Sequence, residues 1–182
     1  MQVTKLGIPG LVLFEPKVHC DQRGSFYESY RRQVFEEATG DAATFVQDNH
    51  TRSLKGVLRG LHYQVPPKAQ GKLIRVVAGE IFDVAVDLRK RSPTFGSWIG
   101  EVLSETSKKQ LWIPAGCAHG FVVLSDTADV IYKTTEYYSP EHECCILWDD
   151  PDLAIQWPIE SRPILSAKDE EGDKLIAAKL FP

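Results

Sequence analysis

The sequence lacks several features that would assign it to a familiar class of protein. None of its apolar runs is long enough to span a bilayer, so no membrane association is expected. The formal net charge is −4, which argues against a nucleic-acid platform but allows a local basic pocket for one anionic ligand. The four cysteines, Cys20, Cys117, Cys144 and Cys145, form no CxxC pair, so neither a zinc knuckle nor a redox motif is indicated.

The first residues also lack the pattern of a signal peptide. The apolar run in MQVTKLGIPGLVLFEP is short and is interrupted by Pro9 and Gly10. Cysteines without a disulfide pattern are typical of a reducing compartment. We therefore expect a cytoplasmic protein with reduced thiols.

The composition is that of a folded globular protein. The chain has 182 residues, of which 43% are hydrophobic and 25% charged, enough to form a sizeable core. No internal repeat, low-complexity tract or linker divides the sequence. We expect a single domain over residues 1–182.

Helix signals are few. The segment RRQVFEEATG places Val34, Phe35 and Ala38 on one face and ends at Gly40, a favourable C-cap. The tail SAKDEEGDKLIAAKLFP can form a second short helix with Ser166 as its N-cap.

Strand signals dominate the rest of the chain. The run LIRVV, AGE, IFDVAVDL predicts a β-hairpin, and further short strands are predicted at WIGEVL, QLWIP, GFVVLS, DVIYKTTEYY and CILWD. Many short strands at this spacing favour an all-β sandwich or barrel with a few short peripheral helices.

Two short patterns narrow the fold further. The first runs from Gly56 to Gln64, includes His62 and is followed by Lys72; the second is PAGCAHGF, which contains His119. Together, in this order, they resemble the two motifs of the cupins, which are double-sheet jelly rolls with a ligand site inside the barrel. The resemblance implies a cupin jelly-roll β-sandwich.

The same patterns argue against the usual cupin metal. In metal-binding cupins the first motif supplies His-x-His and a Glu, and the second supplies another His. Here Gln64 stands at the second His position and Lys72 at the Glu position. His62 and His119 offer at most two ligands, and an ammonium group would repel a cation. We expect a pocket with no metal, in which a lysine could stabilise an anion that develops during a reaction.

Longer segments carry a closer resemblance. They occur in order from about Ile8 to the C-terminal helix: RGSFYESY, FVQDNHTRS, GVLRGLHYQ, PPKAQGKLIRVVAGEIFDVAVDLRKRSPTFG, LWIPAGCAHGFVVLSDTADVIYKTTEYYSPEHE, ILWDDPDLAIQWP and LSAKD. The chain resembles the dTDP-4-dehydrorhamnose 3,5-epimerase family. The resemblance implies a cofactor-independent homodimeric enzyme of dTDP-L-rhamnose synthesis that acts on a dTDP-sugar.

The resemblance also implies roles for individual residues. His62 corresponds to the general base, and Asp169 to the carboxylate that orients it. Tyr132 corresponds to the general acid on the opposite face of the sugar, and Lys72 to the group that stabilises the enolate. Contacts to the diphosphate and sugar are implied for Arg23, Arg59 and His119. Further nucleotide-sugar contacts are implied for Glu28, Gln47, Asn49, Glu143 and Lys168. Aromatic contacts near thymine are implied for Phe26 and Tyr138.

These residue types suit the chemistry. A 4-keto group acidifies the protons on carbons 3 and 5, so removing either proton gives an enolate, and reprotonation from the other face inverts the carbon. The reaction needs a base near neutral pH, an acid on the opposite side and a cation at the ketone oxygen. No electron is transferred, so no redox cofactor is expected.

Each role has a structural alternative. Ser166 and Asp169 have the spacing of a helix capping box, which the sequence alone favours over a catalytic role. Tyr132 could be strand packing, and Lys72 could be a surface lysine. Strict alternation would also place Arg59 and His62 on opposite faces of their strand. We therefore predict an irregularity, such as a bulge, near Gly60.

Other functions remain open from the sequence. The nearest is an epimerase acting at one carbon, or a 3,4-ketoisomerase, on a related dTDP-4-keto-6-deoxysugar. A metal-dependent cupin and a non-catalytic nucleotide-sugar binding module are the alternatives from other classes.

Overall fold

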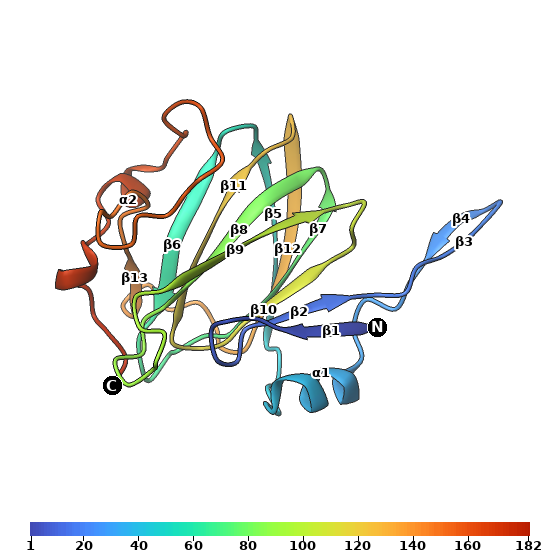
Figure 1. Cartoon of the computed structure of the whole chain (residues 1–182), viewed down its shortest axis with the longest axis horizontal. Helices are drawn as coiled ribbons and strands as arrows, with labels where there is room; N and C mark the ends of the chain where they lie inside the picture. The colour runs from blue at the N-terminus through green and yellow to red at the C-terminus, as the bar shows by residue number, and fades with distance from the viewer.

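The computed structural model describes all 182 residues and contains two antiparallel β-sheets that face each other (Figure 1). The six-stranded sheet has the order β1-β2-β10-β7-β12-β5, with β1 Gln2–Lys5, β2 Val12–Glu15, β5 Gln47–Leu54, β7 Lys72–Ala78, β10 Gln110–Ile113 and β12 Thr127–Thr134. The five-stranded sheet has the order β13-β6-β11-β8-β9, with β6 Leu58–Gln64, β8 Glu80–Asp87, β9 Trp98–Ser104, β11 Cys117–Val123 and β13 Glu143–Cys145. The predicted all-β jelly-roll sandwich is confirmed.

The remaining elements lie at the periphery. Strands β3 (His19–Asp21) and β4 (Gly24–Phe26) form a separate hairpin, called here the arm, that projects away from the sandwich (Figure 1). The helices are α1 (Arg32–Thr39), α2 (Ala167–Glu170) and a 3₁₀ turn at Leu175–Ala177. None of them has the length and apolar character needed to cross a bilayer.

Three apolar clusters hold the layers together. The largest lies between the two sheets and includes Ile74 and Phe121. On the outer face of the six-stranded sheet, Phe35 of α1 packs edge-on against Trp112, with ring centroids 4.8 Å apart. The outer face of the five-stranded sheet is covered by C-terminal residues such as Phe181. Both sheets are therefore packed against apolar residues on their outer faces as well as against each other.

The predicted hairpin of LIRVV and IFDVAVDL is wrong. Strand β7 pairs with β10 and β12, whereas β8 pairs with β9 and β11, so the two strands belong to different sheets. Gly79 makes the turn between them with a φ of +76°. A Cβ there would lie 2.0 Å from the Thr127 carbonyl oxygen. The turn at Gly79 therefore packs against the start of β12. It takes the chain from β7 in one sheet to β8 in the other.

The C-terminal helix is shorter than its sequence allows. Ser166 is the predicted N-cap, but α2 ends at Glu170. The next residues pair instead with the chain after β13, because the Asp173 amide donates to the Cys145 carbonyl and the Leu147 amide donates to the Asp173 carbonyl. The same contact ends the strand predicted at CILWD, where β13 stops at Cys145.

The irregularity predicted near Gly60 is confirmed. His62 pairs with His119 and Arg59 pairs with Phe121, so three steps on β6 match two on β11. Gly60 has a φ of +134°, a conformation that favours glycine. The extra residue rotates Arg59 and His62 towards the same cavity.

We predict that Gly60→Ala destabilises the protein more than Gly24→Ala. A Cβ on Gly60 would lie 2.5 Å from the Gly120 Cα atom, whereas one on Gly24, which has a similar φ of +123°, meets nothing within 4 Å. Backbone strain costs about 1–3 kcal/mol at either site, and the clash adds about 1–3 kcal/mol at Gly60 only. Denaturant unfolding of both variants measures the difference, and equal free energies of unfolding would contradict the close approach.

Candidate active site

A polar cavity of ≈ 360 Å³ lies between the sheets. Strands β5, β7 and β12 line it from one sheet, and β6, β11 and β13 line it from the other. Along β7 the side chains on the inner face change from buried Val76 and Ile74 to Lys72, and along β12 they change from Val130 to Tyr132. The apolar interior therefore gives way to ionisable groups at this end of the sandwich.

A short contact joins His62, which lines the cavity, to Asp169 behind it. The His62 Nε2 atom lies 2.6 Å from Asp169 Oδ1, which also accepts a 3.2 Å hydrogen bond from the Gly60 amide. Burial raises the pKa of Asp169, but hydrogen bonds from His62 and Ser166 outweigh burial and lower the pKa to about 2. Burial lowers the pKa of His62, while Asp169 partly opposes the shift. The pair therefore consists of a carboxylate and a neutral imidazole near pH 7.

Asp169 is part of the predicted helix cap and also contacts His62. Its Oδ2 atom accepts a 2.6 Å hydrogen bond from the Ser166 hydroxyl, and the Asp169 amide donates back to that hydroxyl in a capping box. Its Oδ1 atom meanwhile contacts His62. The helix cap that the sequence favoured is what holds the carboxylate against the imidazole.

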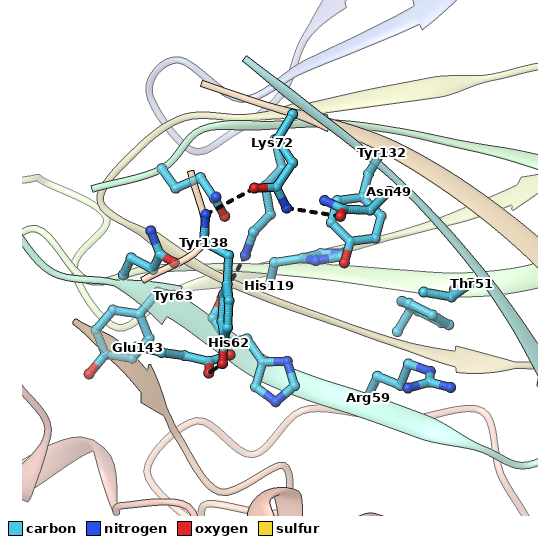
Figure 2. Close-up of a pocket in the computed structure, with 14 residues that line it drawn as sticks. Asn49, Thr51, Arg59, His62, Tyr63, Lys72, His119, Tyr132, Tyr138 and Glu143 are labelled. Carbon is cyan, nitrogen blue, oxygen red and sulfur yellow. Dashed lines mark hydrogen bonds between the residues drawn. The ribbon is translucent and has the colours of Figure 1, made fainter. Parts of the chain in front are cut away.

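Lys72 is a buried cation rather than a surface residue. Its side chain enters the cavity from the start of β7, and Nζ donates a 3.0 Å hydrogen bond to the His62 carbonyl (Figure 2). Burial lowers the pKa of Lys72 to about 8, although the charges of Glu143 and Asp83 oppose the shift. Lys72 is therefore mostly charged at neutral pH and close to losing that charge.

Tyr132 approaches the cavity from the opposite sheet. It lies on β12, whereas His62 lies on β6, and Figure 2 shows the two side chains entering from different walls. Burial raises the pKa of Tyr132, and the nearby charge of Arg59 only partly opposes the increase. The phenol therefore keeps its proton over the neutral range.

A second histidine–aspartate pair lies beside the first. His119 is opposite His62 in the β6–β11 register, and its Nε2 atom lies 2.9 Å from Asp83 Oδ2. Asp83 is fully buried, and its Oδ1 atom has no hydrogen-bond partner. Asp83 was not predicted as a site residue. The available signal was Ala85, an apolar residue on the same face of β8, which is also fully buried.

Polar contacts order the rim of the cavity. Tyr138 donates a 2.7 Å hydrogen bond to Glu143, which also forms an ion pair with Lys168. Gln47 donates to Asn49 and accepts from the Tyr138 amide. On the opposite side, the Arg59 Nε atom donates to the Ser53 hydroxyl at 3.0 Å. The predicted residues Gln47, Asn49, Arg59, Tyr138, Glu143 and Lys168 thus lie in or beside one cavity.

Thr51 is a lining residue that the sequence analysis did not identify. Its buried hydroxyl has no partner in the protein. Thr51 shares a face of β5 with Gln47 and Asn49, a spacing of two that could have indicated it. Its free hydroxyl is available to a polar ligand.

Gln64 occupies the position of the missing cupin ligand but has a structural function. Its amide nitrogen donates to the Lys68 and Tyr137 carbonyls, and its oxygen accepts from the Ser139 amide. These bonds join the loop that contains Tyr138 to the loop that contains Lys68.

Three predicted substrate contacts lie outside this cavity. Arg23 and Phe26 belong to the arm, where Arg23 pairs with Asp21 and Phe26 is 72% exposed. Glu28 follows the arm and pairs with Arg31. The arm extends away from its own sandwich (Figure 1), so this chain cannot bring them to its own site in this conformation.

The expected metal position is not a typical ligand set. His62 and His119 are each hydrogen-bonded to a carboxylate, and Lys72 stands beside them. One group of three side chains with metal-ligating atoms shares His62 with this position and is completed by Cys145 and Asp169.

Comparison with known proteins agrees with this geometry. The sequence profile of the dTDP-4-dehydrorhamnose 3,5-epimerase family matches residues 5–176. A dTDP-4-dehydrorhamnose 3,5-epimerase from Pseudomonas aeruginosa is 59% identical over the full length of both chains. The crystal structure of a 3,5-epimerase from Legionella pneumophila in complex with dTDP-4-keto-L-rhamnose has 52% identity and a TM-score of 0.94, and the match covers 98% of this chain and 94% of that one.

A more distant relative has a narrower activity. The 3′-monoepimerase ChmJ from Streptomyces bikiniensis, solved in complex with dTDP-quinovose, is 36% identical, with a TM-score of 0.89 over 94% of this chain and 86% of that one. The fold is thus shared by enzymes that act at one carbon and at two, but the family profile and the higher identities lie with the double epimerases. The chain belongs to the dTDP-4-dehydrorhamnose 3,5-epimerase family.

Proposed function

We propose that this protein converts dTDP-4-dehydro-6-deoxy-D-glucose to dTDP-4-dehydro-L-rhamnose by inverting carbons 3 and 5, in dTDP-L-rhamnose biosynthesis. The observation that carries the proposal is the cavity itself, in which His62 and Tyr132 enter from opposite sheets and Lys72 lies beside them. A base and an acid on opposite sides of a sugar ring are what inversion through an enolate requires.

His62 is the proposed base. One ring nitrogen donates to the Asp169 carboxylate, which leaves the lone pair of the other nitrogen free to accept a proton. When that proton arrives from carbon 3 or carbon 5, the imidazolium is stabilised by Asp169, whose low pKa keeps it ionised. Asp169 thus acts through His62 rather than on the sugar.

Lys72 is the proposed partner of the enolate oxygen. Its ammonium group is buried and already hydrogen-bonded to the His62 carbonyl. A cation fixed in a low-dielectric site stabilises developing negative charge by about 3 kcal/mol. Tyr132, whose raised pKa keeps the phenol protonated, then delivers a proton from the opposite face.

The remaining polar groups suit a nucleotide sugar. Arg59 and His119 supply donors for the diphosphate and the sugar, and the free Thr51 hydroxyl is a further donor. Tyr138 offers an exposed ring near the rim for thymine, next to Glu143 and its partner Lys168. The four free thiols suit a reducing compartment, and we place the reaction in the cytoplasm.

We further propose that the active enzyme is a homodimer in which the arm of one protomer reaches the cavity of the other. Two-stranded hairpins are marginally stable by themselves, yet this arm carries an exposed Phe26 and a largely exposed Arg23 side chain. The resemblance assigns both residues to the substrate. A partner copy would bury the arm and supply the contacts that each chain lacks at its own site.

The double epimerisation is tested by solvent exchange. The protein, incubated with dTDP-4-keto-6-deoxyglucose in deuterium oxide, should give product labelled at carbons 3 and 5, because both protons pass through the enzyme. Nuclear magnetic resonance locates the label. Label at a single carbon would establish a monoepimerase instead, and tight dTDP binding without any exchange would indicate a binding module.

The proposed base and acid are tested by His62→Ala and Tyr132→Phe. Each should lower turnover by about 10²–10⁴-fold, since each removes one proton-transfer group, while circular dichroism shows an unchanged fold. Tyr137→Phe is the matched control, because Tyr137 is 60% exposed and does not line the cavity. Wild-type turnover in either test variant would refute the role given to that residue.

The pH profile tests Lys72. Because its pKa is lowered to about 8, the ammonium loses its charge as pH rises through that value, and kcat should fall by about tenfold per pH unit above it. Tyr132 does not cause this limb, because its pKa is raised. On the acid side, the lowered pKa of His62 keeps the base neutral below its usual range.

The variant Lys72→Arg identifies the group responsible for the alkaline limb. Arginine stays charged at every pH measured, so the limb should disappear even if the absolute rate is lower. An unchanged limb in Lys72→Arg would assign it to another group.

Complementation tests the arm. Arg23→Ala and His62→Ala should each be nearly inactive alone, whereas mixed and re-equilibrated protomers should recover about a quarter of wild-type activity, because half the dimers are mixed and each has one intact site. Activity after mixing equal to the mean of the separate variants would show that the arm does not serve the partner's cavity.

A further inference from the structure

Cys145 is a titratable residue beside the proposed base that the epimerisation does not use. It lies on β13 directly opposite His62 on β6 in the antiparallel register. Residues paired in this way project to the same face of the sheet, with Cβ atoms about 4.5–5.5 Å apart. The thiol therefore shares the His62 side of the sheet, whereas Cys144 pairs with Tyr63 and packs in the outer apolar cluster.

Asp169 completes a compact set of donors. One ligand atom each from His62, Cys145 and Asp169 lies within 4.8 Å of the others. Imidazole nitrogen, thiolate sulfur and carboxylate oxygen are the three ligand types that bind Zn²⁺, and sites with three protein ligands leave a fourth position for water. Asp169 is 3% exposed and is fixed by Ser166, so at least one donor is already held in place.

The surrounding charge also favours a cation. The carboxylates of Asp169, Glu143 and Asp173 all act on the Cys145 thiol, and Lys168 is the opposing charge. Lys168 is already paired with Glu143. Lys72 and Lys168 act on the His62 side, and their positive charge lowers the affinity for a cation.

We propose that His62, Cys145 and Asp169 form a binding site for a thiophilic divalent transition-metal ion such as Zn²⁺, and that the bound ion blocks the catalytic base. This differs from the cupin metal position, which would use His119. The ion replaces the His62–Asp169 hydrogen bond: the ring proton moves from Nε2 to Nδ1 by exchange with solvent, Nε2 gives its lone pair to the metal, and Cys145 releases its thiol proton to solvent. Nδ1 then has no lone pair with which to accept a proton from the sugar. The inhibitory part rests on the proposed function, whereas binding does not.

Cys145 coordinates as a thiolate, so metal binding releases the thiol proton, and affinity should increase with pH.

Cobalt titration tests binding without reference to activity. Co²⁺ added to the metal-free wild-type protein should give a thiolate-to-cobalt charge-transfer band at one ion per chain, and the band should strengthen with pH. Cys144→Ser should keep the band, because this neighbouring thiol faces the other side of β13. Cys145→Ser should lose it, with affinity lowered by at least about 10-fold, the cost of losing even an outer partner of a metal site.

Three results of the cobalt titration would overturn the proposed metal site. These are the absence of a charge-transfer band in the wild type, a band that survives in Cys145→Ser, and a band that disappears in Cys144→Ser. Circular dichroism and thermal unfolding verify that the variants are folded, and Cys145→Ala provides a second removal of the thiol. If Co²⁺ binds as predicted but no epimerisation is found under any condition, the proposed function fails and the metal site stands.

Inhibition is measured separately with Zn²⁺. Exchange of solvent deuterium into the substrate should stop as Zn²⁺ is added to the wild type and should return on addition of a chelator. Each variant is compared with its own metal-free rate, and Cys145→Ser should require at least about 10-fold more Zn²⁺ for the same fractional loss. Equal sensitivity of Cys145→Ser and the wild type would refute inhibition through this thiol.

Discussion

The carboxylate of Asp169 is the point on which the site depends. One oxygen accepts hydrogen bonds from His62 and from the Gly60 amide in the β6 bulge, and the other accepts from Ser166 at the start of α2. His62, the strand irregularity and the C-terminal helix are therefore joined by one buried anion. Because a buried donor that loses its acceptor costs about 1–3 kcal/mol, the orientation of His62, the proposed base, depends on the docked C-terminal segment.

The buried ions of the cavity suit a reaction that creates negative charge. Lys72 is held by a neutral carbonyl rather than by a direct carboxylate partner, and burial brings its pKa to about 8. In the proposed reaction, a cation that is only partly compensated in the resting enzyme gains most when the enolate forms beside it. The proposed interaction is stronger in the transition state than in the ground state, which is the kind that raises kcat. Asp83 and Glu143 keep enough negative charge nearby for the lysine to stay protonated at neutral pH.

The sequence predicted the elements with clear local signals. The cap at Gly40, the cap at Ser166 and the bulge at Gly60 were all foreseeable, because each depends on the conformational preference of a single residue or on simple parity. The assumed β7–β8 hairpin failed because the choice of partner strand depends on which sheet the chain enters after Gly79, and no local pattern records that choice. Asp83 was missed for a related reason, since burial on both faces of β8 is a property of the assembled sandwich.

Whether a histidine in this cavity is suited to proton transfer or to metal binding depends on the side chains around it, because the imidazole itself can do either. An imidazole in a cupin barrel binds a metal when its neighbours are other neutral or anionic donors. In this chain Gln64 is turned into loop contacts, Lys72 brings positive charge, and each histidine is held by a carboxylate. The carboxylate that raises the basicity of His62 is itself a good metal ligand, and Cys145 stands across the strand pair from it. The arrangement proposed for proton abstraction thus shares two of its groups with the proposed metal site, and the positive charge of Lys72 opposes metal binding there.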